Sequence, residues 1–135
     1  MNRTRLLWGL PAGTLLLAAT LTGCGEDDPA VCSSVDALRS SVADMTDLDI
    51  DQDTLTTLQD DVSEVQADLK QVRSDAKDEY ATEIEAVDQA ATSVTTTLET
   101  ATATPSPAAV VDVGTAVQAL GTALKDLNDA VESTC

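Results

Sequence analysis

LTTLQDDVSEVQADLKQVRSDAKDEYATEIEAVDQAATSVTTTL, residues 55–98, has the apolar spacing of one long amphipathic helix. Its apolar residues and one tyrosine recur in steps of three and four, which keeps them on one helical face, the seam. The seam positions are Leu55, Leu58, Val62, Val65, Leu69, Val72, Ala76, Tyr80, Ile84, Val87, Ala91, Val94 and Leu98. Between Val72 and Ile84, three consecutive steps of four shift the seam around the helix. Because residues 54–102 contain no Gly or Pro, a continuous helix about 70 Å long is permitted at 1.5 Å per residue.

Two shorter seams flank this segment, one on each side. The first consists of Val31, Val35, Leu38, Val42 and Met45, and the second of Val110, Val113, Val117, Leu120, Leu124, Leu127 and Val131. An acidic connector, residues 47–53, separates the first seam from the long one. Residues 100–107 form the other connector, in which we expect Ser106 to cap a helix that begins with Pro107. Strand-like alternation is absent, so the sequence predicts an all-α fold.

The N-terminal residues have the organisation of an export signal. Arg3 and Arg5 precede an apolar stretch, residues 6–21, that is short for a membrane-spanning helix. It ends in a motif that resembles the lipobox of bacterial lipoproteins, Leu21-Thr22-Gly23-Cys24. The resemblance implies that a diacylglycerol is attached to the Cys24 sulfur and that the signal peptide is removed before it. It also implies a location on the extracytoplasmic side of the cell membrane, where two or more acyl chains give stable anchoring.

The resemblance divides the chain and accounts for the cysteines. It implies a signal peptide at residues 1–23, a lipidated N-terminus and short tether at 24–31, and an acidic helical domain at 32–135. With Cys24 lipidated, Cys32 and Cys135 are left as a pair in an oxidising compartment, so we expect a disulfide between them.

The spacing of this pair indicates how the helices are arranged. Antiparallel returns through the two connectors place Cys32 beside about residue 70 and Cys135 beside about residue 75, assuming equal helical rise. We therefore expect a three-helix, coiled-coil-like bundle whose long central helix is flanked by two shorter antiparallel helices. The alternative is a four-helix bundle with a break near residues 74–78.

Composition narrows the possible functions. The chain has 24 Asp and Glu against 7 Lys and Arg, and removal of Arg3 and Arg5 changes its formal charge from −17 to −19. Such a charge disfavours nucleic acid and anionic lipid surfaces. The sequence has no histidine, no nucleophile beside a base and no glycine-rich phosphate loop. We therefore expect neither enzyme activity nor a cofactor.

The acidic connector holds weak candidates for metal ligands. Asp49, Asp51, Asp53 and Asp60 have the spacing of positions 1, 3, 5 and 12 of an EF-hand calcium loop, but Thr54 stands where that loop needs Gly. The alternative is that these carboxylates stabilise the next helix through its dipole and an N-cap at Asp53 or Thr54. We prefer this alternative and assign no firm metal site.

Lys70, Arg73 and Lys77 form a basic stripe at helical spacing. One interpretation is a site for an anionic ligand or partner. The preferred one is an ion-pair cluster, because the cysteine spacing brings the acidic chain ends to this stripe. The partners expected there are Asp36, Asp129, Glu132 and the terminal carboxylate. A strip of small residues around Gly114 and Gly121 favours close helix packing, within the molecule rather than in a dimer.

We expect a membrane-anchored lipoprotein that acts as a structural or protein-interaction module, with a protein or cell-envelope partner that the sequence does not identify. The alternatives are an extracytoplasmic module for a ligand or divalent cation, and self-association through an incompletely covered long helix. Low Lys, Ile and Phe with high Ala, Thr, Asp and Val resembles actinobacterial lipoproteins. The architecture is similar to that of small helical lipoproteins of this group with no assigned activity.

Overall fold

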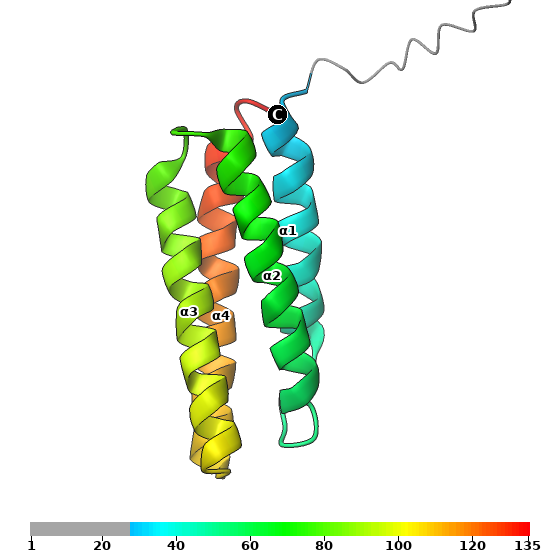
Figure 1. Ribbon diagram of the computed structural model, residues 1–135, viewed down its shortest axis with the longest axis vertical. Helices are drawn as coiled ribbons and strands as arrows, with labels where there is room; N and C mark the ends of the chain where they lie inside the picture. The colour runs from blue at the N-terminus through cyan, green and yellow to red at the C-terminus, as the bar shows by residue number, and fades with distance from the viewer. Residues whose placement is uncertain (1–27) are drawn as a thin grey trace, which may run out of the picture.

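The computed structural model describes residues 28–135, which form four helices and no strand. They are α1 (Ala30–Asp47), α2 (Leu55–Ala76), α3 (Ala81–Ala103) and α4 (Pro107–Val131). Consecutive helices run antiparallel, and each helix packs against two others: α1 and α3 both contact α2 and α4 (Figure 1). The chain is therefore an up-and-down four-helix bundle. α1 begins two residues before the predicted domain start at residue 32.

The continuous long helix predicted for residues 55–98 is wrong, and the four-helix alternative is correct. The break lies at residues 77–80, slightly later than the predicted 74–78. Lys77 has φ 54° with ψ −117°, and Tyr80 has φ 59° with ψ 22° in the left-handed helical region; positive φ of either kind costs a non-glycine residue roughly 1–3 kcal/mol. The turn lets α2 and α3 bury their seams against each other. Each buried Leu or Val contributes about 1.5–3 kcal/mol, so this gain exceeds the strain.

The core consists of the predicted seams. Every seam position of the three segments is buried except Tyr80 and Val110, which are half-buried. The largest fully buried side chains are Leu38, Met45, Leu58, Leu98, Leu120 and Leu127. With no phenylalanine in the sequence, the interior is filled by Leu, Val and Ala, and each residue buries little area.

Local signals at α4 agree with the structure. The Ser106 side chain accepts a hydrogen bond from the Ala109 N–H at 3.1 Å, and Pro107 occupies the first turn, which confirms the predicted cap. Of the two glycines of α4, Gly121 faces α1, and Gly114 faces Ile50 in the connector that follows α1. A Cβ on Gly121 would lie 3.6 Å from Thr46 Cγ2. The small residues thus pack inside the molecule, as predicted.

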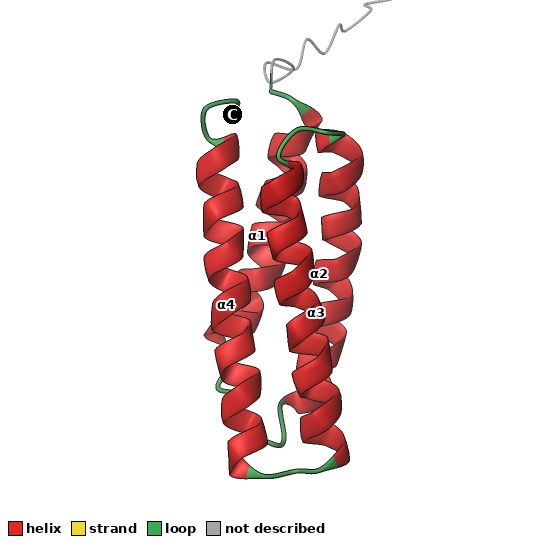
Figure 2. Cartoon of the chain, turned by 90° about the vertical axis from the view of Figure 1, so that its left-hand side faces the viewer, coloured by secondary structure: helices red, strands yellow, loops and turns green. Residues whose placement is uncertain are grey.

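Among residues 28–135, α4 is the one helix long and apolar enough to cross a membrane, judged by length and composition alone. In the bundle its seam is buried, and it packs against α1 and α3 (Figure 2). The predicted signal peptide and Cys24 lie outside the described residues.

Candidate functional site

The two ends of the described chain meet at the end of the bundle that holds the α2–α3 turn (Figures 1 and 2). Cys32 in the first turn of α1 and Cys135 form a disulfide with their Cα atoms 5.7 Å apart, which confirms the predicted pair. The bond joins α1 to the residues that follow α4 across 103 positions of sequence. We call this region the clamped end.

Two side-chain hydrogen bonds tie the clamped end to the turn. The Ser34 hydroxyl donates to Asp75 Oδ2, and the hydroxyls of Tyr80 and Thr134 are hydrogen-bonded to each other. The chain ends therefore contact residues 75–80 rather than the predicted 70–75. Hydrogen bonds from Ser34 and then from Gln71 hold the pKa of the Asp75 carboxyl below its usual value.

A second serine–aspartate pair lies one heptad along the same interface. Ser41 Oγ donates to Asp68 Oδ2 at 2.5 Å, and Ser41, like Ser34, is a buried polar residue on α1. A repeated pair of this kind favours one register of α1 against α2, because in a shifted register the two hydroxyls would keep only their hydrogen bonds to the Ala30 and Ala37 carbonyls. The sequence interpretation missed these pairs, although the serines and the aspartates are each seven residues apart.

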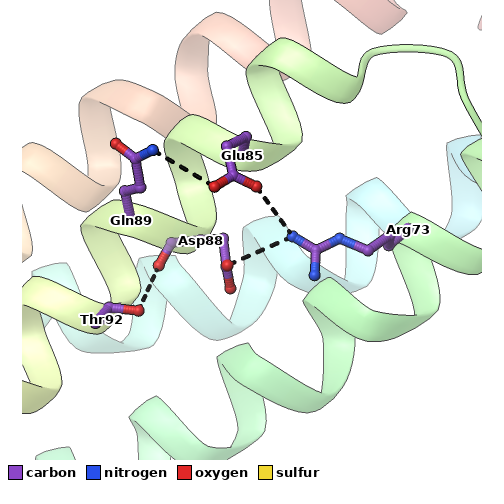
Figure 3. A network of polar contacts seen from close by, with 5 residues as sticks. All are labelled: Arg73, Glu85, Asp88, Gln89 and Thr92. Atoms are coloured by element: carbon purple, nitrogen blue, oxygen red, sulfur yellow. Dashed lines mark hydrogen bonds and ion pairs between the residues drawn. The ribbon is translucent and has the colours of Figure 1, made fainter.

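The basic stripe does not form the expected cluster with the chain ends. Arg73 instead reaches across to α3, where its Nη2 lies 3.7 Å from Glu85 Oε2 and 3.5 Å from Asp88 Oδ2 (Figure 3). Asp129, a predicted partner, pairs with Lys125 at 2.7 Å. The prediction of these partners was wrong because it assumed that two short helices flank one continuous long helix. The two Arg73 pairs link α2 to α3, and the Lys125–Asp129 pair lies within α4.

The other two basic residues do not extend this network. Within residues 28–135, neither Lys70 nor Lys77 has a carboxylate oxygen within the 4.0 Å of an ion pair. Lys77 lies in the turn, beyond the end of α2 at Ala76. Asp36 and Glu132 help to line a shallow hollow beside the disulfide instead. Carboxylates of the described residues therefore engage neither lysine, and the anion-site interpretation stays a prediction.

The acidic connector forms a hydrogen-bonded turn just before α2. Asp51 Oδ1 accepts hydrogen bonds from the N–H groups of Asp53 at 2.9 Å and Thr54 at 3.0 Å. Thr54 is the N-cap of α2, but its side chain donates back to the Asp49 carbonyl and makes no capping bond. The predicted capping bonds from Asp53 or Thr54 are therefore not formed: Asp51 closes the turn that precedes α2, and the first turn of α2 contains no acidic residue.

The metal-ligand spacing is not realised as a cluster. In the described part of the chain, no three Asp, Glu, Cys or His side chains are placed to hold a metal ion. Asp60 lies on an exposed face of α2, in its second turn. Its neighbour Asp61 is half-buried, and burial, followed by the carboxylates of Asp44 and Asp60, raises the pKa of Asp61. Carboxylates in this half of the α1–α2 hairpin repel one another.

The hollows on the described surface are shallow. One of about 320 Å³ lies between α2 and α3 and has Val62 and Leu98 in its lining. The Gln66–Thr95 hydrogen bond, 3.2 Å long, crosses the same interface. The hollow therefore lies on the surface of the α2–α3 interface, which this hydrogen bond bridges.

The chain matches no protein-family model, and no curated protein or solved structure is similar enough to it to indicate a family.

Proposed function

We propose that this protein is an extracytoplasmic lipoprotein, anchored to the cell membrane through Cys24, whose helical bundle acts as a structural or protein-interaction module. The observation that carries the proposal is the use of the three cysteines. Cys32 and Cys135 are joined to each other, which suits an oxidising compartment, and the third cysteine completes the lipobox-like motif.

The short distance along the chain between Cys24 and α1 supports one orientation of the bundle relative to the membrane. α1 begins at Ala30, six residues after Cys24, and six extended residues span at most about 20 Å. The lipid would therefore hold the clamped end close to the membrane. The two connectors at residues 48–54 and 104–106 would then point away from it.

The interaction role is supported by the surface and the core. The apolar seams are buried in the interior of the bundle. The described part of the chain has no buried polar side-chain atom that lacks a hydrogen-bond partner. A closed core with shallow hollows presents helix faces rather than an enclosed ligand site. Such faces are suited to contacts with other macromolecules.

The anchor is tested by mass spectrometry of the protein from the membrane fraction of its host. We expect an N-terminus at Cys24 that carries a thioether-linked diacylglycerol, and release of a Cys24→Ser variant from that fraction. Cys32→Ser is the matched control, since it removes a cysteine without touching the motif and should leave lipidation intact. Recovery of a chain that retains Met1 and an unmodified Cys24 would contradict the proposal.

A further inference from the structure

Three half-buried aspartates recur every seven residues along α2: Asp61, Asp68 and Asp75. The last two accept hydrogen bonds from α1, Asp75 from Ser34 and Asp68 from Ser41. From one bond to the next, both partners move by seven residues, in opposite directions along the two antiparallel helices. Since residues seven apart share a helix face, Asp61 also faces α1. We call the three aspartates, together with the α1 positions opposite them, the aspartate ladder.

The ladder lacks a hydroxyl at its third position. One further step of seven residues along each helix brings Leu48, the C-cap of α1, opposite Asp61. Leu48 is half-buried and packs against the core, but its side chain has no hydrogen-bond donor. The Asp61 carboxylate accepts no hydrogen bond from the described residues. On the connector side, the ladder therefore ends in a carboxylate without a donor.

The charges around Asp61 have its own sign. Asp44 approaches it from α1, and Asp60 stands beside it on α2. On the α3 side of α2, the charged group is again a carboxylate, that of Glu99 in the hollow between the two helices. No Lys or Arg in the described part of the chain forms an ion pair with a ladder aspartate. The ionised form of Asp61 is therefore opposed by its surroundings.

The two ends of the ladder respond to acid in opposite ways. At the clamped end, hydrogen bonds from Ser34 and then from Gln71 hold the pKa of Asp75 below its usual value, and no charged group of residues 28–135 adds to them. Their contribution to stability is lost as the pH falls through the folded pKa. At the connector end, burial and then the carboxylates of Asp44 and Asp60 raise the pKa of Asp61. Here the contribution is full below about pH 4 and is lost as the pH rises through the folded pKa.

We infer that the aspartate ladder is an acid-responsive latch between α1 and α2, which closes the connector end of their interface first and weakens the Ser34–Asp75 bond only in stronger acid. At neutral pH, α1 opens most readily near Leu48, where the carboxylates repel one another. Near pH 4, Asp61 is protonated and α1 closes there. The Cys32–Cys135 disulfide holds the clamped end together when the Ser34 bond weakens. The latch is a property of the fold and depends neither on the lipid nor on a partner.

Residues 28–135 contain the whole core and the disulfide, so this part of the chain serves for the test. Nuclear magnetic resonance of the side-chain carboxyl carbons follows each proton, and Asp61 should take up its proton at a higher pH than Asp75. Leu48→Ser supplies the missing hydroxyl and should lower the pH at which Asp61 titrates. Leu48→Ala is the matched control, because it removes the same packing without adding a donor. At the other end, Ser34→Ala should raise the pH at which Asp75 titrates, whereas Ser40→Ala, at an exposed position of α1, should not.

Amide hydrogen exchange under native conditions shows whether the helix follows these protons. The measure is the protection of residues 44–47 relative to that of residues 34–37, because this ratio cancels changes in overall stability. Between pH 7 and pH 4 the ratio should rise by about twofold, the effect of one like-charge contact on a helix.

Three outcomes would each overturn the inference: a protection ratio that is independent of pH, titration of Asp61 and Asp75 at the same pH, or equal effects of Leu48→Ser and Leu48→Ala. Circular dichroism checks that the variants remain helical. The Ser34→Ala titration and the protection ratio of the unaltered chain decide the question without the Leu48 variants.

Discussion

Asp61 is the residue at which the acidity of the α1–α2 hairpin has a direct energetic cost. Its carboxyl is half-buried, and burial together with the charges of Asp44 and Asp60 raises its pKa. The folded state binds the proton of the Asp61 carboxyl more tightly than the unfolded chain does. The protonated carboxyl therefore contributes to the stability of the fold, and this contribution is fully present below about pH 4. It is lost as the pH rises through the folded pKa. At neutral pH the ionised carboxylate therefore destabilises the bundle.

Asp61→Asn should raise the free energy of unfolding at pH 7 by roughly 0.2–0.5 kcal/mol, the size of a like-charge contact on a helix surface. At pH 3 the gain should vanish, because the carboxyl is then neutral in both states. Urea denaturation at the two pH values measures the difference. Asp126→Asn is the control: it removes the same charge beside Lys125, so it should not stabilise the protein. An equal gain from Asp61→Asn at both pH values would exclude charge crowding as its cause.

At the scale of the elements, the turn between α2 and α3 determines the architecture. It reverses the chain with two residues at positive φ, Lys77 and Tyr80. Tyr80 also packs against the core and hydrogen-bonds to Thr134, so its conformation is supported by contacts. Lys77 is exposed and makes no hydrogen bond or ion pair within residues 28–135 through its side chain. The strain at Lys77 is thus offset by packing elsewhere.

Lys77→Gly should therefore stabilise the protein by about 1 kcal/mol, because glycine adopts positive φ without a steric penalty. Lys70→Gly, the same substitution inside α2, should destabilise it by about 1 kcal/mol. Thermal or urea denaturation of both variants measures whether each substitution raises or lowers the free energy of unfolding. A loss at both positions would mean that residues 55–98 form one continuous helix after all.

The seams, the disulfide and the cap at Ser106 could all be predicted from sequence. The seams and the cap depend on local spacing, and the disulfide follows from the two cysteines that remain once Cys24 is assigned to the lipid. The break at residues 77–80 was only an alternative, because neither Lys77 nor Tyr80 belongs to the residue types that mark left-handed backbone. Its one trace was the run of four-residue steps from Val72 to Ile84. The partners of Arg73 could not be predicted either, since α3 lies beside α2 only once the break exists.

At the scale of the whole molecule, the bundle is two helical hairpins joined at one end. The α2–α3 turn and the Cys32–Cys135 disulfide both lie at the clamped end, where they link the α1–α2 hairpin to the α3–α4 hairpin (Figure 1). At the opposite end each connector stays within its own hairpin. The contact between α1 and α4 joins the helices that are farthest apart in sequence, so it depends most on the disulfide.

Replacing both cysteines, Cys32→Ser with Cys135→Ser, should lower the free energy of unfolding by up to about 4–5 kcal/mol, the chain-entropy contribution of a crosslink around a hundred residues. Amide hydrogen exchange under native conditions should show where the fold loosens. We expect faster exchange first in the early turns of α1 and the late turns of α4, while α2 and α3 stay protected by their turn. Cys24→Ser should change neither quantity. Equal acceleration in all four helices would mean that the disulfide acts only on the unfolded chain, whereas a local effect would show that it holds α1 and α4 together in the folded one.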